Sequence, residues 1–160
     1  MNTKEKFLNL LEQNSRIIYK VCFVYSTAMH SQEDLFQEVI INLWKAWPSF
    51  RNDCKEQTYI YRIALNTCIS CLRKSKSRPS SLPLTQNIEM VAEEYDIAKT
   101  KELYKMINQL DKIEKAIVLL FLEEKSHEEI SQIIGISRSN VAVKLFRIKE
   151  KLKLMYQNQI

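Results

Sequence analysis

The chain has 160 residues, a formal net charge of +5 and 46% hydrophobic residues, enough for a core in one medium domain or two small ones. Only one glycine and three prolines are present, far below the average usage of roughly 7% and 5%, which argues against turn-rich sheets and barrels and predicts an all-α protein. The chain lacks the apolar segment of a signal peptide and any run of the roughly 18 apolar residues that a membrane span needs, so we expect a cytoplasmic protein without membrane insertion.

Helical spacing of apolar residues predicts three helices in the first half of the chain. The first covers residues 5–29. Ser31, followed three residues later by Asp34, is close to a capping box and should begin the second helix. This helix should end near Pro48, which cannot continue it. After a polar loop, the third helix is expected from residue 58 to residue 74.

A break follows at residues 75–90, which contain four serines and two of the three prolines. This composition is typical of an extended linker. We therefore predict two small helical domains, residues 1–75 and residues 96–160, joined by a flexible linker of residues 76–95.

Four helices are expected in the second domain. The first covers residues 96–109. The second follows, and the apolar residues on one side of it are Leu110, Ile113, Ile117, Leu120 and Phe121. Ser126, with Glu129 at the reciprocal capping position, should begin a short third helix that runs to Ile134. The fourth should run from about Arg138 to the end of the chain.

The single glycine, Gly135, lies between the last two of these helices. A tight turn there requires positive φ, which glycine adopts without a Cβ clash. We therefore predict a helix-turn-helix motif. An ordinary helical hairpin with a solvated basic face is the alternative that this segment alone leaves open.

Basic residues gather in two separate segments, which suggests two contacts with a nucleic acid. Residues 73–78 contain four basic residues and no acidic residue. Residues 138–153 contain six basic residues and one acidic residue. A helix that enters the major groove places its first residues over base edges. Arginine can bind guanine, and asparagine adenine, through two hydrogen bonds. The base-reading candidates are Arg138, Ser139 and Asn140, and the phosphate-binding candidates are Lys144, Arg147 and Lys151.

The predicted second helix carries a mixed polar and apolar face. Asp34, Gln37 and Glu38 share one side of it, and Ile41 and Trp44 continue that side. Exposed aromatic and apolar residues beside polar ones are typical of a protein interface. The alternative is that the two apolar residues only widen the core stripe.

Aromatic and basic residues are mixed in the predicted third helix. Tyr59 and Tyr61 can stack on unpaired bases, and stacking beside a basic surface is typical of single-stranded nucleic acid binding. The alternative is that both tyrosines belong to the core. The residues suited to following a phosphate backbone are Arg62, Arg73, Lys74 and Lys76.

Catalysis and metal binding are not expected. Cys68 and Cys71 form a CxxC pair, but a structural zinc site needs four ligands. The other candidate ligands, which show no companion spacing, are Cys22, Cys54, His30 and His127. We therefore expect reduced thiols, no metal site, no cofactor, no small-molecule substrate and no enzymatic activity.

Three segments, in this order, resemble the conserved regions of the extracytoplasmic-function sigma factors, compact two-domain sigma subunits of bacterial RNA polymerase. "DLFQEVIINLW" (34–44) is similar to region 2.2, and "YIYRIALNTCISCLRK" (59–74) to regions 2.3 and 2.4. Residues 110–153, which include the predicted helix-turn-helix, are similar to region 4. The resemblance implies an all-helical two-domain fold and a role in promoter recognition, promoter melting and initiation.

The resemblance also implies partners and residue roles. The partners are core polymerase, through its β′ coiled coil and β flap, promoter DNA, and an anti-sigma factor. The docking face for core polymerase is Asp34, Gln37, Glu38, Ile41 and Trp44. The −10 element is bound by the loop of residues 52–57 and the helix after it, through Asn52, Asp53, Lys55, Gln57, Tyr59, Arg62, Asn66, Arg73 and Lys74. The −35 element is read by Arg138, Ser139, Asn140, Val143, Lys144 and Arg147.

The chain departs from the family pattern in its last helix. Family members often have a basic residue and a small hydroxyl where this chain has Ala142 and Val143, and Ser139 and Asn140 replace a common Gly-Thr pair. The promoter sequence is therefore not implied, although Val143 can contact a thymine methyl group. Two other functions stay open: an operator-binding regulator that acts without docking on polymerase, and a helical adaptor that binds only proteins.

Overall fold

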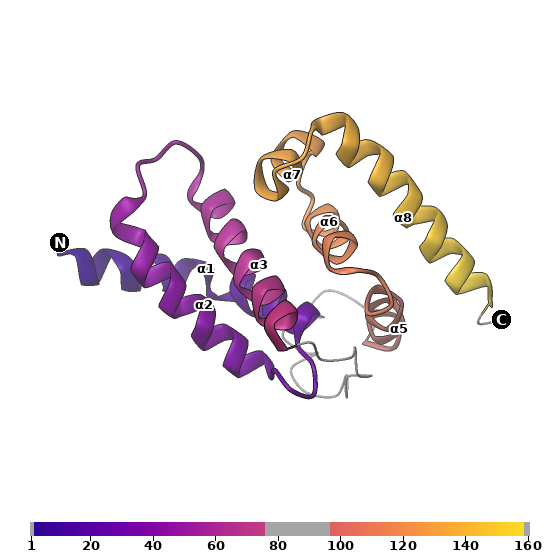
Figure 1. Cartoon of the computed structure of the whole chain (residues 1–160), viewed down its shortest axis with the longest axis horizontal. Helices are drawn as coiled ribbons and strands as arrows, with labels where there is room; N and C mark the ends of the chain where they lie inside the picture. Colours follow the sequence, from indigo (N-terminus) through magenta and orange to yellow (C-terminus); the bar gives the residue numbers. More distant parts are fainter. Residues whose placement is uncertain (1, 76–96, 159–160) are drawn as a thin grey trace. The chain divides into compact units, whose positions relative to one another are not determined.

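The computed structural model describes residues 2–75 and 97–158, and all the regular structure in these ranges is helical (Figure 1). The prediction of an all-α fold is therefore confirmed. The chain divides into two compact units, Met1–Pro83 and Leu84–Ile160. The predicted linker of residues 76–95 lies outside the described residues. Within the described ranges, no helix combines the length and apolar character needed to cross a bilayer.

The first unit consists of α1 (Thr3–Tyr25), α2 (Gln32–Ala46), the 3₁₀ turn η1 (Trp47–Ser49) and α3 (Glu56–Ser75). Ser31 begins α2 as predicted, because its Oγ accepts a hydrogen bond from the backbone N–H of Asp34 at 3.1 Å. Such N-cap bonds satisfy donors that have no partner inside the helix. The third helix begins two residues earlier than predicted.

Helices α1, α2 and α3 pack against one another around an apolar core. Ile18, Val39 and Ala64, one from each helix, are fully buried. Several buried polar side chains of this unit are hydrogen-bonded, as burial favours, although Nε2 of His30 is buried without a partner among the described residues. The Asn42 side chain, for example, donates to the Thr67 hydroxyl at 2.9 Å and links α2 to α3.

The second unit consists of α5 (Ile97–Ile107), α6 (Lys112–Leu122), α7 (His127–Ile134) and α8 (Arg138–Asn158). Helix α6 packs against both α7 and α8, and its five consecutive residues 116–120 are all buried. The expected single apolar side of this helix is therefore only partly right. Ile113 and Phe121 are exposed at its two ends, because neighbouring helices cover its middle from more than one direction.

Candidate nucleic-acid and polymerase interfaces

A helix-turn-helix motif is formed by α7, Gly135 and α8. Gly135 has φ 85° and ψ 29°, in the left-handed region, and its N–H donates to the Ser131 carbonyl at 2.9 Å. A Cβ built on this glycine would meet no atom within 4 Å. The predicted need for positive φ is confirmed, and the requirement for glycine is conformational rather than steric.

Two serines that the sequence analysis did not single out position the start of α8. The Ser131 hydroxyl donates to the Ile136 carbonyl at 2.6 Å, which holds the chain as it leaves the turn. The Ser137 hydroxyl accepts from the Asn140 N–H at 3.1 Å and so caps α8. A serine three residues before that N–H, just ahead of a helical pattern, is an N-cap signal that the sequence did contain.

Helix α8 buries one side and exposes the other. Val141, Leu145 and Ile148 are buried as α8 packs on α6 and α7. All six predicted −35 residues lie on exposed parts of α8, and the cationic side chains among them make no ion pair within the described residues. These six are Arg138, Ser139, Asn140, Val143, Lys144 and Arg147.

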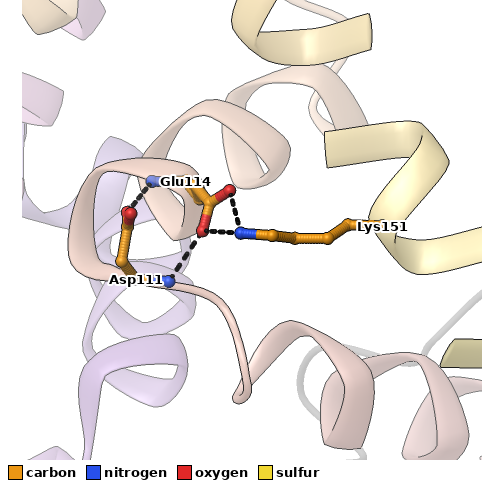
Figure 2. Close-up of polar contacts among 3 residues, drawn as sticks. All are labelled: Asp111, Glu114 and Lys151. Carbon is orange, nitrogen blue, oxygen red and sulfur yellow. Dashed lines mark hydrogen bonds and ion pairs between the residues drawn. The ribbon is translucent and has the colours of Figure 1, made fainter. Parts of the chain in front are cut away.

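Lys151 does not extend this basic surface, contrary to the sequence analysis. Its ammonium group lies 2.7 Å and 3.0 Å from the two carboxylate oxygens of Glu114 (Figure 2). Glu114 belongs to α6, where it forms a capping box with Asp111, and its hydrogen bond raises the pKa of Lys151. Lys149 also reaches α6, with its Nζ 4.3 Å from the centre of the Phe121 ring. These two lysines therefore hold α8 to α6.

The predicted docking face is one continuous exposed surface of α2. Asp34, Gln37 and Glu38 are exposed, and Ile41 and Trp44 are each 46% exposed. The two apolar residues are therefore more than an extension of the core stripe. An acidic and polar strip beside exposed apolar side chains is suited to a protein partner.

Aromatic rings pack against one another beneath the exposed face of α2. The Trp44 ring contacts the buried Phe7 ring edge-on, with the centroids 4.9 Å apart. Ring contacts continue from Trp47 to Phe50 at 5.5 Å and from Phe50 to Tyr59 at 4.5 Å. Such contacts contribute stability beyond their buried area. They also join the end of α2 to the loop before α3.

The loop before α3 ends at Lys55, two residues before the end that we predicted. Asn52 adopts φ 60°, a left-handed conformation that asparagine tolerates better than most residues. Asn52, Asp53 and Lys55 are exposed in the loop. Gln57 instead lies in the first turn of α3, because the helix begins at Glu56.

Four of the predicted −10 residues form a stripe along α3. Tyr59, Arg62, Asn66 and Arg73 recur at three, four and seven residues, which places them on one side of the helix. Lys74 is exposed near the end of this stripe, whereas Gln57 lies on the opposite side of the helix. The candidate −10 surface therefore consists of the loop before α3 and one side of α3, and it does not include Gln57.

The two tyrosines differ. Tyr61 is buried, which confirms the core alternative for that residue. Tyr59 is half-buried, and Phe50 covers part of its ring. Burial, with a smaller effect from Cys54, raises the pKa of Tyr59, so its hydroxyl stays protonated. Arg62 donates to the Cys54 sulfur at 3.7 Å.

The thiols of the first unit lie closer together than their spacing in the sequence indicates. A hydrogen bond with Cys22, together with burial, raises the pKa of Cys68 well above its ordinary value. Burial, with the charge of Glu38 nearby, raises the pKa of Cys71. The thiols of Cys68 and Cys71 are therefore protonated and poorly reactive. Among the described residues, no group of three potential ligands could hold a metal ion.

Two parts of the chain match known families. Residues 10–78 match the Sigma-70 region 2 family, and residues 100–152 match the family described as Sigma-70, region 4. The ECF RNA polymerase sigma factor SigW of Bacillus subtilis is 28% identical over 94% of this chain and 88% of its own length. The ECF RNA polymerase sigma-E factor of Escherichia coli is 29% identical over 92% of this chain and 85% of its own length.

A solved structure shares the fold. The sigma factor RpoE, solved in complex with the anti-sigma factor NepR from Bartonella quintana, matches with a TM-score of 0.74 and 17% identity, over 96% of each chain. The first matched region falls within the first helical unit, and the second matched region falls within the second. The chain therefore belongs to the extracytoplasmic-function family of RNA polymerase sigma factors.

Proposed function

We propose that this chain gives bacterial RNA polymerase its specificity for one set of promoters. It binds core polymerase, recognises the −35 and −10 elements, helps to melt the promoter and so initiates transcription. The observation that carries this proposal is the pairing of two different surfaces in one chain. The first unit presents an acidic and apolar face on α2. The second presents a helix-turn-helix with exposed basic side chains on α8.

The two basic surfaces have different tasks in this proposal. Duplex DNA at the −35 element is read by a helix in the major groove, and α8 presents Arg138 and Asn140 at its N-terminal end for that purpose. Unpaired DNA at the −10 element has to be held by stacking and charge. The stripe of α3 offers the half-buried ring of Tyr59 for stacking and Arg62 for charge, beside the loop of Asn52.

Partners beyond core polymerase and promoter DNA follow from the same proposal. An anti-sigma factor would inhibit this chain by covering the α2 face or α8. This part is supported by the likeness to RpoE in its complex with NepR, and to CnrH in complex with the cytosolic domain of CnrY. The chain itself would act in the cytoplasm, where its polymerase is, and would catalyse no reaction.

Reconstitution with core polymerase tests the proposal. The purified chain is mixed with core enzyme, and run-off transcription is measured on genomic DNA fragments. We expect a stable complex and transcripts that begin downstream of a shared −35 and −10 pair. Specific binding to duplex DNA without any association with core enzyme would instead identify an operator-binding regulator, and binding to neither would identify an adaptor.

Arg147 and Lys151 are expected to have different roles, because only Lys151 is ion-paired to Glu114. Replacing Arg147 with glutamine removes a phosphate contact, so the slope of log affinity against log salt should fall by about one for holoenzyme on the −35 duplex. Replacing Lys151 with glutamine should leave that slope unchanged and lower the unfolding temperature of the second unit, because its ammonium group is bonded to Glu114. Equal effects of the two changes on the slope would contradict this division.

A further inference from the structure

An apolar patch lies on the exposed side of α8, between the cationic residues. Val143 is 46% exposed and Phe146 is 67% exposed, and Ala142 is exposed beside them. None of the three contributes to the buried stripe of Val141 and Leu145. An exposed phenylalanine gives up the stabilisation that burial would provide, and a contiguous exposed apolar patch is typical of an interaction site.

The three residues form one contiguous surface. Ala142 and Val143 lie one helical turn before Phe146, at four and three residues, so their side chains are neighbours. Ser139, one of the predicted base-reading residues, lies one turn earlier on the same side of α8. The patch is therefore continuous with the end of α8 that is proposed to read bases.

Charge identifies the kind of partner that this patch fits. From Arg138 to Lys149 the helix contains no acidic residue, and Arg138, Lys144 and Arg147 are exposed around the patch. A polyanion is therefore favoured over a neutral or basic protein surface. In the major groove of DNA, the apolar group that distinguishes a base edge is the 5-methyl group of thymine.

We infer that Ala142, Val143 and Phe146 form a thymine-reading patch. The inference rests on the proposed function and makes it more specific: the −35 duplexes that this chain selects should carry thymine methyl groups opposite the patch. Ala142 and Phe146 are four residues apart, so they are separated by roughly 6 Å along the helix axis. This span is close to two base-pair steps of roughly 3.4 Å, so the methyl groups should lie on base pairs no more than two steps apart.

Removing the methyl groups from the DNA tests the inference without altering the protein. The −35 sequence is first selected from a randomised promoter library with holoenzyme. Each thymine of the selected element is then replaced by deoxyuridine, which keeps the hydrogen-bonding edge and loses only the methyl group. We expect binding by holoenzyme to weaken roughly fourfold for each methyl group that the patch contacts.

Variants link this effect to the patch. Val143→Ala and Phe146→Ala should bind thymine and deoxyuridine duplexes almost equally, with unchanged unfolding midpoints because both side chains are exposed. Leu154→Ala is the matched control, since Leu154 is 58% exposed on α8 two turns beyond Phe146. This control should keep the full thymine preference.

The outcomes separate the inference from the proposed function. Correct initiation by the holoenzyme with no effect of deoxyuridine at any −35 position would overturn the inference and leave the proposed function intact. An effect that persists in Val143→Ala and Phe146→Ala would also overturn it. Failure of the holoenzyme to initiate at any promoter would overturn both.

Discussion

Replacing Gly135 with valine is expected to disrupt the second unit and abolish recognition of the −35 duplex, while binding to core polymerase through the α2 face is retained. The glycine has φ 85°, where a non-glycine residue costs roughly 1–3 kcal/mol and a β-branched residue lies at the upper end. A domain of this size has roughly 3–5 kcal/mol of stability. The substitution therefore removes a large part of it. Thermal unfolding and −35 duplex binding measure the effect.

The control for this prediction is Gly135→Asn. Asparagine enters the left-handed region at low cost, and a Cβ at this site would touch no other atom within 4 Å. We expect near-normal unfolding and DNA binding from this variant. An asparagine variant as damaged as the valine variant would contradict a purely conformational role for the glycine. Loss of core binding in the valine variant would show that the two units depend on each other.

Replacing Ile41 with aspartate is expected to weaken core polymerase binding by about 30-fold or more, without destabilising the first unit. Ile41 is exposed at the centre of the proposed docking face, and losing an interface anchor costs about 2 kcal/mol or more. Burying an unpaired carboxylate there would add to this cost. The affinity of the variant for core enzyme and its unfolding midpoint measure the two effects separately.

Leu8→Asp is the matched control, because Leu8 is also an exposed apolar residue of the first unit but lies on α1. We expect normal core affinity from it. If both aspartate variants lost affinity equally, the effect would come from added negative charge rather than from the position of Ile41. Unchanged affinity in both would place the docking surface elsewhere.

Local signals explain why much of the fold could be predicted from the sequence. The N-caps Ser31 and Ser126 act within three residues of themselves, and the structure contains both of their predicted hydrogen bonds. Gly135 likewise depends only on its own backbone angles. These features need no knowledge of the rest of the chain, so periodicity and capping rules were sufficient.

Contacts between distant residues account for what the sequence did not reveal. The pairing of Lys151 with Glu114 joins positions 37 apart, and the contact of Cys22 with Cys68 joins two different helices. The spacing of residues within one helix does not predict either of these two contacts between helices. For the same reason the exposure of Phe121 was not foreseen, since it depends on which helices surround α6.

The ring contacts beneath the α2 face have a practical consequence. The two tryptophans of the chain, Trp44 and Trp47, both lie at this end of the first unit, and both contact Phe7. Intrinsic tryptophan fluorescence therefore reports on the first unit alone, whereas the second unit is silent at the same wavelengths. Because Trp44 is partly exposed on the proposed docking face, its emission should shift when polymerase covers it. The unlabelled protein thus carries its own optical probe.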